Sequence, residues 1–258
     1  MEQKQIVVQN LILNYYALES KKEKGGKVLV FLHGWRSDST VWFETMEIMA
    51  ELGYHSIALD LPGFGKSQTP DQVFNTDKYA DLVVEFLNKL KLEKSICIGH
   101  SYGGRVLIDI GVNNKADLEK IILVDASGVG IKEGEMNLKK TLAKIIKPLF
   151  KPKFMQGLRK KIYQSIGAED YIVAEDSPFF KETYQNILRD QYNELLAKIK
   201  TPLFMIWGEE DQDTPLVMAV EIQHATHGKL VAMEKAGHFP FIDQPEEFVK
   251  ILDSFLTE

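Results

Sequence analysis

The chain has 258 residues, 45% of them hydrophobic and 26% charged, so it is long enough for one folded domain and too apolar for a disordered one. Its net charge of −6 argues against general nucleic-acid binding, which usually needs a basic excess. The single cysteine, Cys97, excludes an intramolecular disulfide and a thiolate metal site.

The N-terminal stretch MEQKQIVVQNLILNYY lacks the basic start, apolar run and small-residue cleavage site of a secretory signal. No apolar run in the chain reaches about 18 residues, the length that a membrane-spanning helix needs. We therefore expect a cytoplasmic protein without a transmembrane segment.

Apolar runs of strand length alternate along the chain with segments of helical periodicity. The predicted strands are residues 27–34, 55–62, 94–101, 119–126, 201–208 and 228–237. The predicted helices are residues 40–52, 76–91, 102–113, 215–225 and 245–257. This alternation predicts an α/β fold with a mostly parallel, doubly wound sheet, whose ligands bind at the carboxyl ends of the strands.

The alternation fails once, between residues 128 and 199, where the sequence shows helical patterns and no convincing strand. A loop of this length without secondary structure would be unusual in a compact domain. We therefore predict a helical cap at 128–199, inserted into a core formed by residues 1–127 and 200–258.

The stretch DLPGFGKS, residues 60–67, ends like a phosphate-binding loop. Such a loop requires G-x-x-x-x-G-K-[ST], and the position five residues before Gly65 is Asp60 rather than glycine. The stretch is therefore predicted to be a tight turn, and we assign no catalytic role to Lys66 or Ser67.

A nucleophile motif lies where the predicted strand at 94–101 meets the next helix. Gly99-His100-Ser101-Tyr102-Gly103 fits the pattern G-x-S-x-G. In such a turn the serine has a strained backbone and projects above the sheet, and side chains at 99 and 103 would collide with neighbouring backbone. Ser101 is therefore the candidate nucleophile.

A serine needs a base to take its proton and an acid to orient that base. Among six histidines, only His238 lies in a loop at the carboxyl end of a strand and after the acid candidates. Asp211, three residues past Gly208, is the favoured acid, while Asp125 and Asp213 remain possible. The order Ser101, Asp211, His238 is the nucleophile, acid, base order of one particular fold.

Together, five segments resemble successive signatures of the α/β-hydrolase superfamily, in the right order. They are LHGW (32–35), DLPGFGKS (60–67), GHSYGG (99–104), WGEEDQDTP (207–215) and GHFPFIDQPEEF (237–248). The resemblance implies an oxyanion hole formed by the backbone N–H groups of Trp35 and Tyr102. The indole of Trp35 is not part of this assignment.

A serine at the elbow favours acyl chemistry, and we expect a carboxylesterase that cleaves small to medium acyl esters without a cofactor or metal. Carbon–carbon bond hydrolases of the same fold share the three residues, although their usual tryptophan after the catalytic histidine is replaced here by Phe239-Pro240-Phe241. A ligand receptor or signalling protein with negligible turnover is also compatible with these residues. So is an enzyme that excludes water and acts as an acyltransferase or lyase.

The predicted cap is basic over part of its length. Residues 132–161 contain ten Lys or Arg and two Glu, a charge of +8 that leaves −14 for the rest of the chain. The simplest interpretation is a solvated lysine face above an apolar roof. A second interpretation is a surface that attracts an acidic partner or an anionic substrate, whose binding would weaken steeply with salt.

Overall fold

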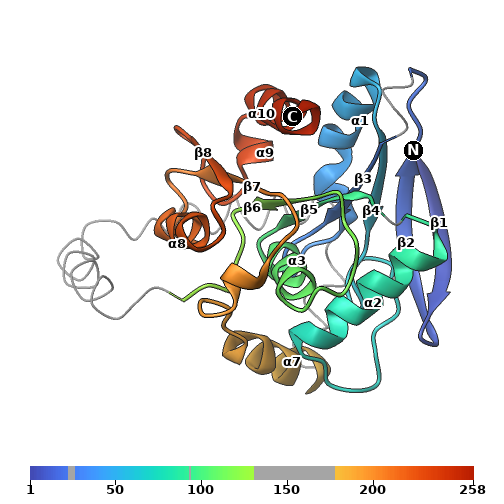
Figure 1. Ribbon diagram of the computed structural model, residues 1–258. Helices are drawn as coiled ribbons and strands as arrows, with labels where there is room; N and C mark the ends of the chain where they lie inside the picture. Colours follow the sequence, from blue (N-terminus) through green and yellow to red (C-terminus); the bar gives the residue numbers. More distant parts are fainter. Residues whose placement is uncertain (23–26, 93, 131–177) are drawn as a thin grey trace, which may run out of the picture.

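The computed structural model describes residues 1–22, 27–92, 94–130 and 178–258. Within them, eight strands form one sheet in the order β1-β2-β4-β3-β5-β6-β7-β8 (Figure 1). They are β1 Glu2–Val8, β2 Leu11–Leu18, β3 Val28–Leu32, β4 His55–Leu59, β5 Ile96–His100, β6 Lys120–Val124, β7 Leu203–Gly208 and β8 Lys229–Met233. Every pair from β4 to β8 is parallel, which confirms the predicted mostly parallel sheet.

The first two strands form an antiparallel hairpin that the sequence analysis missed. Val8 pairs with Leu11, and the two residues between them, Gln9 and Asn10, have φ values of 47° and 65°. A two-residue turn with both φ angles positive matches the right-handed twist of the flanking strands. Asparagine adopts positive φ more readily than most residues, so Asn10 could have predicted this turn from the sequence. Strand β2 joins the hairpin to β4, again antiparallel.

The five predicted helices are present, each within a few residues of its predicted bounds, and further helical segments accompany them. The described helices are η1 Ser39–Trp42, α1 Phe43–Leu52, α2 Thr76–Lys89, α3 Tyr102–Val112, α7 Pro178–Arg189, η3 Leu196–Lys198, α8 Val217–Thr226, α9 Pro240–Asp243 and α10 Pro245–Thr257.

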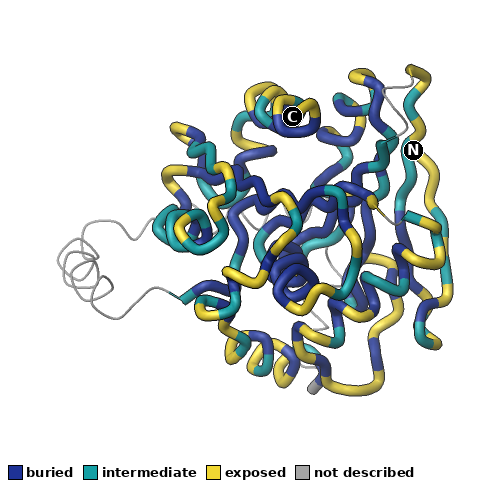
Figure 2. The backbone as a smooth tube through the Cα atoms, in the orientation of Figure 1, coloured by how far each residue is buried: buried dark blue, intermediate teal, exposed yellow. Residues whose placement is uncertain are grey.

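The helices cover both faces of the sheet, because successive side chains of a strand point to opposite sides. On β3, Val30 and Leu32 pack in the core cluster that includes α2, α3 and α8, whereas Leu29 and Phe31 pack in the cluster that includes α1 and α10. Figure 2 shows the central strands buried between these layers. The edge strand β8 is only partly buried, unlike the central strands.

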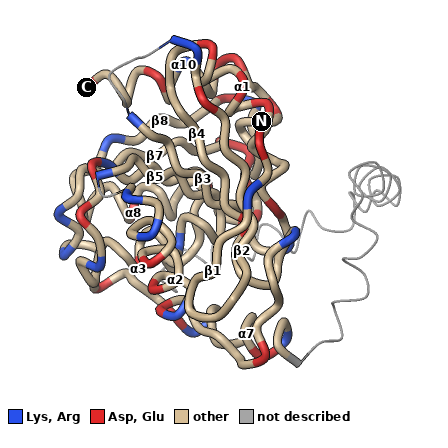
Figure 3. The backbone as a smooth tube through the Cα atoms, turned by 90° about the vertical axis from the view of Figure 1, so that its right-hand side faces the viewer, with Lys and Arg blue, Asp and Glu red and all other residues tan. Residues whose placement is uncertain are grey.

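Charged side chains lie mainly on the helices and outer segments, and the central strands carry few of them (Figure 3). In the described part of the chain, no helix combines the length and the apolar character needed to cross a membrane.

The turn after β4 is held together by hydrogen bonds to the side chain of Asp60. Asp60 Oδ2 accepts a hydrogen bond from the backbone N–H of Lys66 at 2.9 Å. Gly65 has a φ of 53°, and a Cβ there would lie 2.4 Å from the Asp60 carboxyl group. Lys66 donates to Gln3 Oε1 at 2.8 Å, and the Ser67 hydroxyl donates to the carbonyl oxygen of Asp60 at 2.6 Å. These contacts confirm the tight turn.

Helix α7 belongs to the segment predicted as a cap, and it docks on the chain just before and at the start of α2. The backbone N–H of Phe74 donates to Thr183 Oγ1 at 3.0 Å, and that of Thr76 donates to Asp190 Oδ2 at 3.1 Å. The rings of Phe74 and Phe179 meet edge to face. The basic stretch 132–161, and with it most of the predicted cap, lies outside the described residues.

Candidate active site

Ser101 lies on the sharp turn between β5 and α3, with φ 50° and ψ −110°. A non-glycine residue in this region is strained, as the motif predicted. A Cβ at Gly99 would lie 2.6 Å from the backbone of Gly103, and one at Gly103 would lie 2.5 Å from the carbonyl oxygen of Leu32. Both glycines are therefore required for the chain to turn this tightly.

His238 and Asp211 come together although 27 residues separate them. His238 Nδ1 lies 2.8 Å from Asp211 Oδ2, and the Asp211 carboxylate is fully buried. Asp211 Oδ2 also accepts from the hydroxyl of Thr214 at 2.6 Å, and Oδ1 accepts from the backbone N–H groups of Asp213 and Thr214 at 2.8 and 3.0 Å. Burial raises the pKa of Asp211, but hydrogen bonds from His238, Asp125 and Thr214 outweigh it and hold the pKa well below its ordinary range.

Asp125, a second acid candidate at the end of β6, lies behind Asp211. Its Oδ1 accepts from the backbone N–H of Gly208 at 3.0 Å. Burial, together with the Asp211 carboxylate, raises the pKa of Asp125 to about 10, so this group holds a proton at neutral pH. Oδ2 of Asp125 is buried and has no other partner among the described residues, so the proton on Asp125 is available to the neighbouring Asp211 carboxylate, whose pKa it lowers. Of the three acid candidates, the structure pairs only Asp211 with the imidazole.

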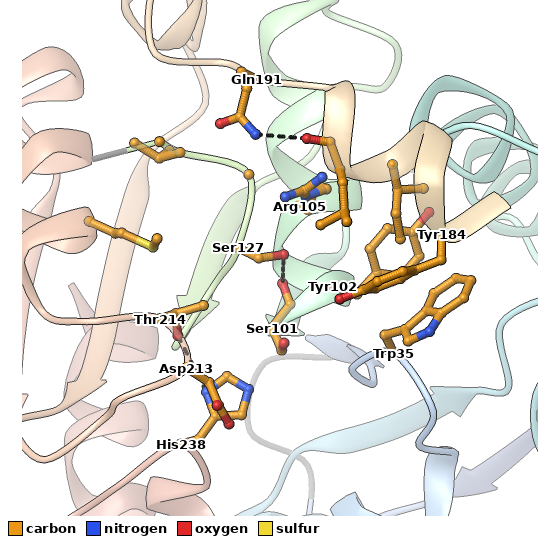
Figure 4. A pocket seen from close by; sticks show the side chains of 16 residues that line it. Trp35, Ser101, Tyr102, Arg105, Ser127, Tyr184, Gln191, Asp213, Thr214 and His238 are labelled. Atoms are coloured by element: carbon orange, nitrogen blue, oxygen red, sulfur yellow. Dashed lines mark hydrogen bonds between the residues drawn. The ribbon is translucent and has the colours of Figure 1, made fainter. Parts of the chain in front are cut away.

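Ser101 and His238 line one cavity of about 510 Å³, and their side chains face each other across it (Figure 4). Asp213, the third acid candidate, also lines it, but its side chain is exposed and its backbone supports Asp211. The lining residues are Trp35, Ser101, Tyr102, Arg105, Ser127, Gly128, Val129, Gly130, Tyr184, Ile187, Leu188, Gln191, Asp213, Thr214, Met218 and His238. The apolar side chains of the wall include Val129, Ile187, Leu188 and Met218, and its charged or polar ones include Arg105, Gln191, Asp213 and His238.

The two residues expected to supply backbone donors flank Ser101. Tyr102 is the first residue of α3, so its N–H has no acceptor within the helix. Trp35 follows Gly34, where a Cβ would lie 3.1 Å from the Cβ of Ser101. Among the described residues, neither N–H has a hydrogen-bond acceptor. The indole of Trp35 packs edge to face against Phe64 and Tyr102.

His33 and His100 are buried supports rather than reacting groups. His33 Nδ1 donates to the carbonyl oxygen of Gly34 at 2.8 Å, and its Nε2 accepts from the N–H of Leu61 at 3.0 Å. His100 Nε2 donates to the carbonyl oxygen of His238 at 2.7 Å and so supports the loop that carries that residue. Burial, followed by repulsion from His238, lowers the pKa of His100 to about 3.

We expect this buried neutral imidazole to make folding stability depend on pH. The unfolded chain takes up a proton at His100 near pH 6.5, whereas the folded chain does so only near pH 3. Between these values the unfolded state binds more protons, so this residue lowers the free energy of unfolding by up to about 1.4 kcal/mol for each unit by which pH falls. Urea titrations at pH 7, 6 and 5 measure the slope. The slope should be shallower in His100→Gln, and an equal slope in both proteins would contradict this assignment.

One group in the described part of the chain has the ligand types of a metal site. Asp125, Asp211 and His238 bring one possible ligand atom each within 4.8 Å of one another. The chemistry does not fit a cation, because both oxygens of Asp211 already accept hydrogen bonds and Asp125 holds a proton. The three residues instead lie in a row, with Asp211 between the protonated Asp125 and the imidazole of His238.

Comparison with known proteins decides the family. The model of the alpha/beta hydrolase family matches residues 29–251. The chain belongs to this family. The AB hydrolase superfamily protein YisY of Bacillus subtilis is similar to this hydrolase, with 26% identity over 89% of this chain and 91% of that protein. The pimeloyl-[acyl-carrier protein] methyl ester esterase of Wigglesworthia glossinidia brevipalpis is 26% identical over 91% of this chain and 95% of that one.

Among solved structures, an esterase from Exiguobacterium antarcticum matches the hydrolase with a TM-score of 0.78 and 21% identity, over 100% of both chains. Identity at this level shows the common fold alone. The family match identifies the chain as a hydrolase.

Two features of the site were not predicted. The sequence predicts Asp125 only as a possible acid partner of the histidine, whereas this residue is a protonated group behind Asp211, and the sequence gives no role to Arg105. The sequence signal for Arg105 was its position, four residues after Ser101 on a helix whose only other charged residue is Asp109.

Proposed function

We propose that this hydrolase is a serine carboxylesterase that cleaves small to medium acyl esters. The observation that carries the proposal is the convergence in one cavity of a strained serine and a histidine whose other ring nitrogen is held by a buried carboxylate. This arrangement has the parts of a Ser-His-Asp triad, with Ser101 as nucleophile, His238 as base and Asp211 as the orienting acid.

In the proposed reaction, the Ser101 hydroxyl attacks the ester carbonyl carbon while its proton passes to Nε2 of His238. Asp211 holds Nδ1–H, which fixes the tautomer and stabilises the imidazolium. The tetrahedral intermediate collapses to an acyl-enzyme, and His238 gives the proton to the departing alcohol. Water then attacks the acyl carbon in the same way, which releases the carboxylic acid and restores Ser101.

The oxygen of the ester carbonyl gains negative charge as the tetrahedral intermediate forms. The N–H groups of Trp35 and Tyr102 flank Ser101 and are assigned as its donors. Because such donors are already in place before the reaction, they stabilise the transition state without reorganisation. The absence of an acceptor for either N–H among the described residues supports this assignment.

Carbon–carbon bond cleavage, acyl transfer and ligand binding without turnover are also compatible with the same three residues. No contact in the described part of the chain favours one of them over ester hydrolysis. Product analysis separates them: hydrolysis of an ester yields acid and alcohol in equal amounts, whereas acyl transfer gives a new ester or thioester when an alcohol or thiol is added.

A fluorophosphonate probe tests the proposal without knowledge of the substrate. We expect the probe to modify Ser101, as read by mass spectrometry of peptides, because only an activated serine reacts rapidly. Labelling should be lost in His238→Ala. Modification of Ser127, the other serine hydroxyl of the cavity, or unchanged labelling in His238→Ala would contradict the assignment.

A further inference from the structure

Arg105 places a buried cation on the wall of the candidate active site. The residue is only 5% exposed, yet it lines the same cavity as Ser101. Its Nε and Nη1 atoms are buried and have no hydrogen-bond partner. A guanidinium stays charged in a protein, and burying a charge without a partner costs folding free energy. The position of Arg105 in the cavity wall therefore suggests that the charge has a function.

Two nearby carboxylates serve other groups. Asp109 Oδ2 accepts from the hydroxyl of Tyr192 at 2.8 Å, and Asp190 Oδ2 accepts from the backbone N–H of Thr76 at 3.1 Å. In the part of the chain that the structure describes, no carboxylate forms an ion pair with Arg105. Burial lowers the pKa of Arg105, as expected for a cation that lacks a close counter-ion. The guanidinium therefore keeps donors without a partner among the described residues, and it lies on the wall of the cavity.

The position of Arg105 relative to Ser101 is fixed by α3. The backbone N–H of Arg105 donates to the carbonyl oxygen of Ser101 at 3.2 Å, the first hydrogen bond of that helix. Ser101 is the N-cap of α3, so Arg105 lies about one turn further along the helix, a rise of about 6 Å. Figure 4 shows Arg105 and His238 on opposite sides of Ser101. In the proposed reaction His238 protonates the leaving alcohol, which leaves the Arg105 side of Ser101 for the acyl group of an ester (Figure 4).

We propose that Arg105 binds a carboxylate at the far end of the acyl group, so that the enzyme acts on half-esters of short dicarboxylic acids. The inference rests on the proposed ester hydrolysis at Ser101 and names its substrate class. The planar fork of a guanidinium matches a carboxylate with two parallel hydrogen bonds. Val129, Ile187 and Met218 contribute apolar surface to the cavity, which suits the methylene chain between the two ends.

A comparison of matched esters tests this directly. Monomethyl glutarate and monomethyl adipate are compared with methyl valerate and methyl hexanoate, in which a methyl group replaces the carboxylate, and methanol release is measured. In the wild type, kcat/KM should be higher for the half-esters. In Arg105→Met the ratio of half-ester to neutral ester should fall about 10-fold to 100-fold, the range for one hydrogen-bonded charged group.

Two further variants control this comparison. Arg189→Met removes the same charge from the exposed face of α7 and should leave the ratio unchanged. Arg105→Lys keeps the charge without the fork, so an intermediate ratio is expected. If Arg105→Met does not fold, Arg105→Lys decides, because a ratio equal to that of the wild type would overturn the proposal.

A binding measurement separates this proposal from the proposed function. Glutarate binding is measured by calorimetry on Ser101→Ala, and on Ser101→Ala combined with Arg105→Met, where the affinity should fall at least about tenfold. If no ester is turned over but glutarate binding depends on Arg105, ester hydrolysis is wrong and the anion site stands. If both the specificity ratio and glutarate binding ignore Arg105, the anion site is wrong, whatever the turnover.

Discussion

Replacing Ser101 by alanine is expected to lower kcat for p-nitrophenyl butyrate by about 10⁴-fold to 10⁶-fold. The hydroxyl is the only protein group that bonds to the acyl carbon in the proposed mechanism, so its loss leaves only substrate positioning and the backbone donors. Steady-state release of p-nitrophenol measures the change. Circular dichroism and the melting temperature verify that the variant is folded.

The matched control is Ser127→Ala, which removes the other serine hydroxyl of the same cavity. Ser127 Oγ donates to the carbonyl oxygen of Ser101 at 3.3 Å, a long hydrogen bond, so a loss of less than about tenfold is expected. A folded wild type that releases no p-nitrophenol from acetate or butyrate esters would favour a receptor without turnover. Equal losses in both variants would remove Ser101 from its assigned role.

Replacing Asp211 by asparagine is expected to lower kcat by about 10⁴-fold, because an amide that donates to Nδ1 of His238 holds the imidazole in the wrong tautomer. The remaining two acid candidates provide the comparison. Asp125 is a protonated donor, and an amide N–H can replace its O–H, so Asp125→Asn should lose less than about tenfold. Asp213 acts through its backbone, so Asp213→Asn should behave similarly.

The three variants are compared by kcat on one ester, with melting temperatures to separate activity from folding. A large loss in Asp125→Asn with a small loss in Asp211→Asn would transfer the orienting role to the end of β6. Similar large losses in both would mean that Asp125 contributes more than a donor to Asp211, for example by keeping that carboxylate in place.

The sequence alone determined the parallel sheet, the helices on its faces and the serine elbow. Each of these depends on neighbouring residues: a buried strand is an apolar run, and the elbow needs glycines two residues to either side of Ser101. The order Ser101, Asp211, His238 and the tight turn at Asp60 were also readable, since both follow from spacing along the chain.

Tertiary contacts decided the rest. Asp125 and Asp211 both follow buried strands, and only their contacts across the sheet show that Asp211 meets the imidazole while Asp125 lies behind it with a raised pKa. The environment of Arg105 was likewise decided by tertiary contacts. Its sequence neighbours predict an amphipathic helix, but whether a cation there is paired depends on residues far along the chain. Charge pairing and burial are properties of the folded interior, so no local pattern encodes them.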